Sequence, residues 1–522
     1  MATDSSPARP AKGPAATRVI VVGAGPVGLF LAGELRLGGA DVVVLERLRT
    51  PTTESRASTL HARTVELFDC RGLLAALGDP PREPRGHFGG VPMDLTMPSP
   101  HSGQWKVPQT RTEELLQEWA ESLGADVRRG WEVRGLTQRD GHVDVVAETP
   151  DGPRRLRAAY LVACDGEDST VRRLTGADFP GTPAGRELLR ADIAGIDIPD
   201  RRFERLDRGL AIAARMPGGT TRVMVHEFGT PAPARTGPPS FAEVVGAWRR
   251  VTGEDLSGGR PVWLNAFGDA NQQLTQYRHG RVLFAGDAAH RQMPSGGQAL
   301  NLGLQDAANL GWKLAAVACG RAPQGLLDTY HDERHEVGRR VLANIRVQAL
   351  LLLGDRAVEP ARTLLGELIA AGPARQHLAA MITGLDIRHP VGGGTHPLLG
   401  ARLPLGTLPT PDGPVSVAGL LRTGRGLLLV SESARAELRW LGKVWSDRVT
   451  PVAVLPDATG PLHAAEGRPY EAEARPYDAK SPLYDADGLL VRPDGHVAWA
   501  GTDPWAATAA IRHWFGRPDP GL

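Results

Sequence analysis

A glycine-rich turn near the N-terminus constrains the fold of this chain more than any other feature. Residues 18–22 (RVIVV) predict a buried strand, and the turn 23–28 (GAGPVG) follows and leads into an apolar helix. A second buried strand at 41–45 ends at Glu46. Two buried strands joined by a helix form a parallel pair, so the sequence predicts an α/β fold that opens with a Rossmann-like unit.

The turn carries the residues that a bound dinucleotide needs. Gly23, Gly25 and Gly28 satisfy G-x-G-x-x-G after a strand and before a helix, where the backbone can approach a pyrophosphate. The helix N-terminus adds partial positive charge for phosphate oxygens. The Glu46 carboxylate suits a ribose diol and would repel a 2′-phosphate, which excludes NADP from this site. The motif alone does not separate FAD from NAD.

Two further segments place acids at the ends of predicted strands. Residues 164–172 (CDGEDSTVR) contain Asp165, and residues 286–301 (GDAAHRQMPSGGQALN) contain Asp287. In open α/β sheets, ligands bind at the carboxyl ends of the strands. We therefore expect both acids to lie near the dinucleotide.

These three motifs together resemble the para-hydroxybenzoate-hydroxylase-type flavoprotein monooxygenases. The resemblance extends from about Arg18 to Arg340 and includes further matches at 56–66, 108–109, 306–314 and 330–334. The C-terminal portion, with 490–499 (LVRPDGHVAW), resembles the thioredoxin-like tail of larger members. Among those members, the chain is most similar to bacterial hydroxylases of angucycline- and anthracycline-like polyketides.

The resemblance implies an α/β fold, α+β overall, in three parts. A Rossmann-like FAD domain spans 18–180 and 275–390, and an antiparallel-sheet substrate domain is inserted at 181–274 with part of 85–108. A thioredoxin-like domain spans 396–522; it contains no cysteine, so we expect a packing or dimerisation role, with Trp499, Trp505 and Trp514 on a packed face. Residues 1–17 are small, polar and Pro-rich, which predicts a disordered tail.

The resemblance also implies contacts with FAD. Arg56 would contact the pyrophosphate, Gln109 the ribityl or phosphate region, and Asp287 the ribityl hydroxyls, while 294–301 would wrap the isoalloxazine. Asp165 would lie near the pyrophosphate and the nicotinamide route. Met293 and Ala299 depart from the family's usual proline and glycine. The expected cofactor-binding residues are Gly23, Gly25, Pro26, Gly28, Glu46, Arg47, Arg56, Gln109, Asp165, Gly286, Asp287, Pro294, Gly296, Gly297, Ala299, Leu300 and Asn301.

The implied reaction is aromatic hydroxylation through a C4a-hydroperoxyflavin. Backbone N–H groups of 299–301 would stabilise reduced flavin, and one such donor is typically worth about 3 kcal/mol. No second strand–GxGxxG–helix unit is present, so NADPH or NADH is expected as a transient co-substrate, and the absence of a CxxC pair argues against a disulfide reductase. Baeyer–Villiger oxygenation, a flavin oxidase or dehydrogenase, and a non-catalytic flavin-binding protein remain open alternatives.

The substrate is expected to be a polycyclic aromatic of the polyketide type. No tyrosine lies between Tyr160 and Tyr277, so the substrate domain cannot supply the tyrosines that small-phenol hydroxylases use to deprotonate substrate. The candidate pocket residues are Met224, His226, Trp263, Phe267 and Arg291; the weak catalytic candidates are Pro294, Arg291 and His226.

Composition excludes several other classes. The formal net charge is +1, with 60 basic and 59 acidic side chains, which gives no field for nucleic acid or an anionic membrane. No apolar run approaches the ~18 residues that suggest a membrane span. Three scattered cysteines fit a reducing cytoplasm, with Cys164 a buried filler. His331 and His335 lack a third ligand, so no metal is expected, and a homodimer is compatible with the sequence.

Overall fold

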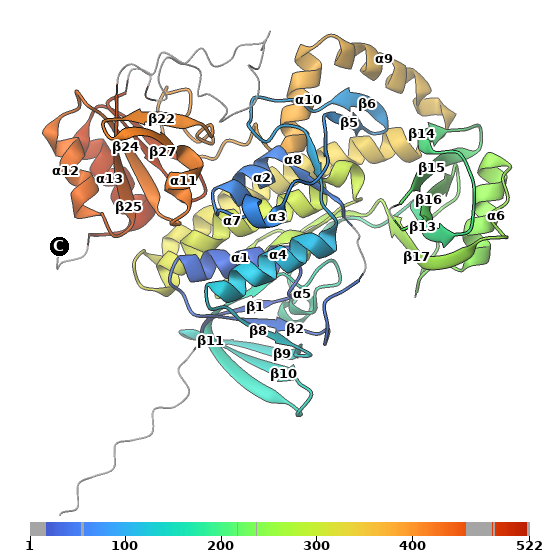
Figure 1. Ribbon diagram of the computed structural model, residues 1–522. Helices are drawn as coiled ribbons and strands as arrows, with labels where there is room; N and C mark the ends of the chain where they lie inside the picture. Colours follow the sequence, from blue (N-terminus) through green and yellow to red (C-terminus); the bar gives the residue numbers. More distant parts are fainter. Residues whose placement is uncertain are drawn as a thin grey trace, which may run out of the picture.

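The computed structural model describes residues 17–53, 57–216, 218–235, 237–455, 483 and 486–518. The tail predicted at 1–17 lies outside the described residues except for Thr17, and so does Arg56. In Figure 1 a central body carries the inserted antiparallel sheet on one side and the C-terminal unit on the other.

The central body is built on a mainly parallel sheet. Its order is β19-β20-β11-β1-β2-β8, with every pair parallel except β19–β20. Val19–Val21 and Val42–Leu45 are buried on both faces, which explains why these strands are continuous apolar runs. The hairpin β9–β10 extends β11 on its antiparallel side. The bounds are β1 Thr17–Val22, β2 Val42–Glu46, β8 Asp126–Arg129, β9 Glu132–Arg139, β10 His142–Glu148, β11 Arg154–Ala163, β19 Arg278–His279 and β20 Val282–Phe284.

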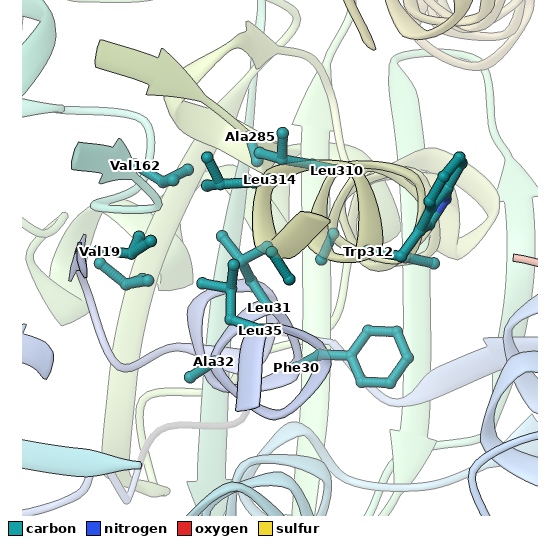
Figure 2. Packing of buried hydrophobic residues seen from close by; sticks show 14 of the residues in the cluster. Val19, Phe30, Leu31, Ala32, Leu35, Val162, Ala285, Leu310, Trp312 and Leu314 are labelled. Atoms are coloured by element: carbon teal, nitrogen blue, oxygen red, sulfur yellow. The ribbon is translucent and has the colours of Figure 1, made fainter. Parts of the chain in front are cut away.

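Two helices, α1 (Pro26–Leu37) and α7 (Gln298–Ala318), pack closely beside this sheet. A Cβ on Gly311 of α7 would lie 2.3 Å from Cβ of Glu34 on α1, so glycine permits the approach. Figure 2 shows Leu31 and Leu35 of α1 facing Leu310 and Leu314 of α7. The other helices of this part are α2 Ala62–Asp69, α3 Leu74–Leu77, α4 Gln109–Ser122 and α5 Thr170–Thr175.

The inserted part is an antiparallel sheet with one covered face. Its order is β14-β15-β16-β13-β17, and α6 packs on it through Trp248 and Val244. Ser240 and Glu243 form a capping box that fixes the start of α6. The bounds are β13 Glu187–Ala194, β14 Arg201–Arg205, β15 Gly209–Arg215, β16 Thr220–Glu227, β17 Arg260–Gly268 and α6 Phe241–Thr252.

A long helix, α8 (Asp328–Leu353), runs from the central body to the inserted sheet (Figure 1). Its last turns contact that sheet on one side, through Ile345 and Leu352, and the hairpin β5–β6 on the other, through Leu351. The neighbouring elements are α9 Glu359–Ala370, α10 Pro373–Thr383, β3 Thr59–His61, β4 Arg82–Glu83, β5 Arg85–Phe88, β6 Val91–Asp94, β7 Gln104–Lys106, β12 Gly181–Thr182, β18 Asn271–Gln273 and β21 His290–Arg291.

The C-terminal unit is a four-stranded mixed sheet with flanking helices, as expected of a thioredoxin-like domain. Its order is β25-β24-β26-β27, and only β24–β25 is parallel. Trp514 is buried, but Trp505 is 83% exposed, so the predicted packed face of three tryptophans is wrong for Trp505. Trp505 stands in the first turn of its helix and points away from the sheet-facing stripe that holds Ile511 and Trp514. The bounds are β22 Thr407–Thr410, β23 Gly413–Ser416, β24 Gly426–Ser431, β25 Val449–Val454, β26 Gly488–Val491, β27 Val497–Gly501, α11 Val417–Leu421, α12 Ala436–Val444 and α13 Pro504–Phe515.

Candidate active site

The glycine turn lies between β1 and α1, as the sequence predicts. A Cβ on Gly23 would lie 2.4 Å from the Cys164 carbonyl oxygen, and one on Gly28 would lie 2.0 Å from the Gly23 carbonyl oxygen. Both positions therefore require glycine for packing. No atom lies within 4 Å of a Cβ built on Gly25, so this backbone faces open space at the N-terminus of α1, where Pro26 begins the helix. That arrangement can admit a pyrophosphate.

Glu46 lies at the end of β2 and faces the same turn. Its Oε2 accepts a hydrogen bond from the Ala24 N–H at 2.8 Å, and its Oε1 accepts from the Leu48 N–H at 2.8 Å. The carboxylate is thereby fixed at the edge of the glycine turn, while Arg47 is exposed beside it. Gln109, at the start of α4, accepts from the Ala57 N–H at 3.1 Å and so contacts the segment that follows Arg56.

Asp165 caps α5. Its two carboxylate oxygens accept from the Ser169 hydroxyl at 2.5 Å and the Val171 N–H at 3.0 Å, and burial raises its pKa. Arg172 of the same helix donates to the Ala288 carbonyl oxygen at 3.0 Å. The two acidic motifs, 116 residues apart between Arg172 and Ala288, are therefore joined directly at the carboxyl end of the sheet.

A buried ionic group holds the turn that carries Asp287. Asp306 of α7 accepts from the Gly286 N–H at 3.2 Å, from His290 at 2.8 Å and from Arg334 of α8 at 2.7 Å. Burial opposes ionisation of Asp306, but Arg334 and His290 outweigh it and hold its pKa below the ordinary range. Asp287 itself is exposed between the buried residues Gly286 and Ala288. Its carboxylate is therefore presented from a rigid turn.

The segment expected to wrap the flavin ring forms the entrance to α7. Gly296 and Gly297 have φ values of 60° and 73°, and α7 begins at Gln298, so the N–H groups of 299–301 lie in its first turn. Helix N-termini stabilise negative charge. Asn301 ties this turn to β3, accepting from the His61 N–H at 2.8 Å and donating to the Thr59 carbonyl oxygen at 3.0 Å. Pro294 is exposed.

A chain of side-chain amides supports this loop from α8. Gln348 Oε1 accepts from the Ser295 hydroxyl at 3.0 Å and from the Gly89 N–H at 3.3 Å. Gln348 Nε2 donates to Asn344 Oδ1 at 2.9 Å, and Asn344 Nδ2 donates to Gln298 Oε1 at 3.2 Å. A backbone N–H can only donate, so the Gly89 contact fixes the orientation of every amide in the chain.

The candidate pocket residues of the inserted domain share one face of its sheet. Cross-strand pairs place Arg190 beside Met224 and Leu188 beside Phe267, on the face opposite α6. This face packs against Met293, which is 2% exposed and directly precedes the flavin loop. The Arg190 guanidinium lies 4.2 Å from the Trp263 ring centre. The sheet face and the flavin loop therefore meet.

The remaining candidates have evident structural partners. The two ring nitrogens of His226 face the carbonyl oxygens of Glu187 at 2.8 Å and Leu353 at 3.1 Å, and burial lowers its pKa. Arg291 pairs with Glu167, with Nε 3.0 Å from Oε2. Cys164 is buried and unbonded to another cysteine, as its interpretation as a filler requires.

A separate cavity of about 210 Å³ lies between α7, α8 and α10. Gln298 and Asn301 line it near the flavin loop, and Val337, Arg340 and Met381 are among its other walls. No lining residue comes from the inserted sheet. Sequence reasoning did not anticipate this cavity, nor the roles of Asp306, Arg334, Asn344 and Gln348. For Asp306, Asn344 and Gln348 the available signal was a polar residue within an apolar helix stretch, whereas Arg334 lies in a charged run.

The donors and acceptors present fit FAD. Two helix N-termini, an unobstructed glycine backbone and the exposed Asp287 converge at the carboxyl end of one sheet. Across the described ranges, no group of three or more His, Cys, Asp or Glu side chains is arranged to hold a metal ion. No helix within those ranges is long and apolar enough to cross a membrane.

Comparison with known proteins agrees with this geometry. The FAD binding domain family matches residues 16–345, and the aromatic-ring hydroxylase C-terminal family matches 396–518. The 12-dehydrotetracycline 5-monooxygenase/anhydrotetracycline 6-monooxygenase of Streptomyces rimosus is 40% identical over 96% of this chain and 99% of its own length. Dialkyldecalin synthase of Streptomyces rugosporus is 38% identical over 95% of this chain and 98% of its own length.

The crystal structure of CabE, described as an aromatic hydroxylase from angucycline biosynthesis, superposes with a TM-score of 0.88. Its sequence is 49% identical, and the match covers 97% of this chain and 100% of CabE. Both the sequence families and the three-dimensional match span the FAD-binding part and the C-terminal part together. The chain therefore belongs to the family of FAD-dependent aromatic-ring hydroxylases.

Proposed function

We propose that this protein hydroxylates a polycyclic aromatic polyketide, with O2 as the oxygen donor and NADPH or NADH as the source of two electrons. One oxygen atom enters the ring as hydroxyl, and the other leaves as water. The observation that carries the proposal is the meeting of the flavin loop with an apolar sheet face through Met293. The 40–49% identity to a tetracycline monooxygenase and an angucycline hydroxylase supports the substrate class.

The geometry above supports several of the expected FAD contacts. The Gly25 backbone and the N-terminus of α1 would receive the pyrophosphate, Glu46 the adenosine ribose, and Asp287 the ribityl hydroxyls. When bound, FAD supplies the redox chemistry and oxygen activation. The first turn of α7 would place N–H groups against the pyrimidine end of the flavin, where reduction adds negative charge.

The protein's own contribution is positioning and exclusion of water. Leu188, Met224 and Phe267 present an apolar wall on which a flat ring system can lie. Arg190 is 5% exposed and stands on the same wall, where a cation would favour an ionised phenol or polarised quinone oxygen. This replaces the tyrosines that the inserted domain lacks.

Heavy-oxygen labelling tests the proposal. FAD-loaded protein, NADPH and ¹⁸O2 are incubated with a panel of angucyclinone, anthracyclinone and tetracyclic substrates, and the products are analysed by mass spectrometry. We expect a product heavier by one ¹⁸O atom on a ring carbon. A labelled lactone would indicate Baeyer–Villiger insertion, and hydrogen peroxide with unlabelled product would indicate an oxidase. A product formed equally well without O2 would contradict the proposal.

A further inference from the structure

Among the contacts between the C-terminal unit and the central body, one buried turn, Arg492–Asp494, carries a cluster of charged side chains. Arg492 is fully buried and contacts Glu333 of α8 with two nitrogens, at 2.6 and 2.8 Å. Its Nε and Nη2 also contact the Asp494 carboxylate at 3.1 and 2.5 Å. Asp494 Oδ2 accepts from Asn309 and Trp312 of α7, each at 3.3 Å. The turn therefore bridges α7 and α8.

The same turn is bound from the side of α1 and α2. Arg63 of α2 donates to the Asp494 carbonyl oxygen at 2.6 Å. Arg71 donates to the Pro493 carbonyl oxygen at 3.0 Å and forms a buried ion pair with Glu34 of α1, with Nε 2.5 Å from Oε1. One short turn of the C-terminal unit thus contacts α2, α7 and α8 directly and reaches α1 through Arg71. Two of these helices, α1 and α7, present their N-termini to the FAD site.

A second group of buried charged side chains, Asp306 and Arg334, lies about one helical turn from the contacts of Arg492 and Asp494. This second layer holds the turn that carries Asp287. Asp306 precedes Asn309 by three residues, about 4.5 Å along α7, and Arg334 follows Glu333 directly on α8. Asp306 and Arg334 contact each other and the Gly286 backbone, as described above. A polar cavity of about 10 Å³ between the layers is lined by Arg334, Asn309 and Asp494. The layers therefore share both helices.

We propose that the Arg492–Asp494 turn is a positioning element for FAD: by fixing α7 against α8, it keeps Asp306 and Arg334 in register with the Gly286–Asp287 turn. This assigns a role to the cysteine-free C-terminal unit that its fold alone does not suggest. The proposal rests on FAD binding, which the family establishes, and not on the proposed substrate. A buried ion pair contributes little net stability, so a positioning role is compatible with this cluster.

The test compares the FAD dissociation constant of matched variants, measured by fluorescence quenching at a temperature where circular dichroism shows each apoprotein folded. Asp494→Asn preserves shape, removes the charge and should raise the constant about tenfold. Trp312→Phe removes one donor to Asp494, keeps an aromatic ring beside Phe515 and Arg492, and should raise the constant about threefold. This milder variant decides the matter if Asp494→Asn does not fold. Constants within twofold of the wild type would overturn the proposal.

Two controls separate positioning from general loosening of the C-terminal unit. Asp447→Asn removes an ion pair with Arg448 in the same unit, 2.7 Å long; Arg448 contacts the central body at the Arg321 carbonyl oxygen, beyond the C-terminal end of α7. Leu441→Ala opens the packing of α12 and should lower the unfolding temperature without changing the FAD constant. If Leu441→Ala raised the constant as much as Asp494→Asn, the turn would be a stabilising contact only.

A double variant tests the route through Asp306. If the turn acts by holding Asp306, then Asp494→Asn adds little to the FAD constant once Asp306→Asn is present. Fold-changes that simply multiply would show that the two layers act independently and would contradict the proposed route.

Discussion

Gln348 donates its side-chain Nε2 to Asn344 Oδ1 at 2.9 Å, and this bond lies at the centre of a one-way chain from the Gly89 N–H to Gln298. Both residues lie on α8, four positions apart, and both are buried. The chain ends at the first residue of α7, next to the left-handed glycines of the flavin loop. Helix α8 therefore determines how that loop enters α7.

Replacing Gln348 with Met should lower the free energy of unfolding by about 2 kcal/mol, because the Gly89 and Ser295 donors lose their acceptor inside the protein. Urea unfolding of the holoprotein measures the change. Arg346→Met on the exposed side of the same helix should stay within about 0.5 kcal/mol of the wild type. A Gln348→Met protein as stable as the wild type would show that the amide chain does not form.

Replacing Asp287 with Ala should weaken FAD retention by about 1.5–3 kcal/mol, the usual worth of a hydrogen bond to a charged group. The change removes an acceptor without disturbing the turn, because Asp306 and Arg172 hold its backbone. Dialysis followed by flavin absorbance measures the bound fraction. Asp140→Ala, in the exposed β9–β10 hairpin, is the matched control and should retain FAD fully.

The imidazole of His61 should make stability depend on pH. Burial, with Lys106 adding to the effect, lowers the pKa of His61 to about 4, whereas the unfolded chain titrates near the ordinary value of 6.5. The unfolded state therefore binds a proton first. The contribution of neutral His61 to the free energy of unfolding is complete above pH 6.5. It is lost as the pH falls toward 4, by up to about 1.4 kcal/mol per pH unit.

A His61→Phe variant should flatten this dependence between about pH 6.5 and about pH 4.5, measured by urea unfolding. His87, whose pKa is also lowered to about 4, and His496, lowered to about 3, retain part of the slope. His377→Phe replaces an exposed histidine and should leave the slope unchanged. An identical slope in His61→Phe would mean that position 61 is not buried in solution.

Flavin reduction by NADPH should be slow without an aromatic substrate and much faster with one. The described residues contain a single strand–GxGxxG–helix unit, which we assign to FAD, so the nicotinamide lacks a dinucleotide fold of its own. Contact between the nicotinamide and the flavin should then depend on a conformational change that occurs when the substrate binds. Stopped-flow absorbance of oxidised flavin, with and without a polycyclic quinone, measures the ratio. Equally fast reduction in both cases would favour an oxidase.

The sequence by itself determined the parts of this protein that depend on local chemistry. Gly23, Gly25 and Gly28 predicted the dinucleotide turn: only glycine fits at positions 23 and 28, and Gly25 leaves the backbone open at the start of α1. The resemblance predicted the inserted sheet at 181–274, and the candidate pocket residues Met224, Trp263 and Phe267 share one face of it. The family resemblance predicted FAD as the cofactor and a thioredoxin-like fold for the C-terminal part. The periodicity of the sequence alone predicts neither.

Only the tertiary structure decided which distant polar groups meet. Asp306 forms hydrogen bonds with Gly286, Arg334 and His290, and Arg492 pairs with Glu333, which is 159 residues away in the sequence. Such pairings depend on how helices pack, and no local spacing encodes them. Trp505 shows the converse: its apolar character predicted burial, but its place in the first turn of α13 leaves it in solvent. Local pattern specifies which element forms, and packing specifies which of its faces is covered.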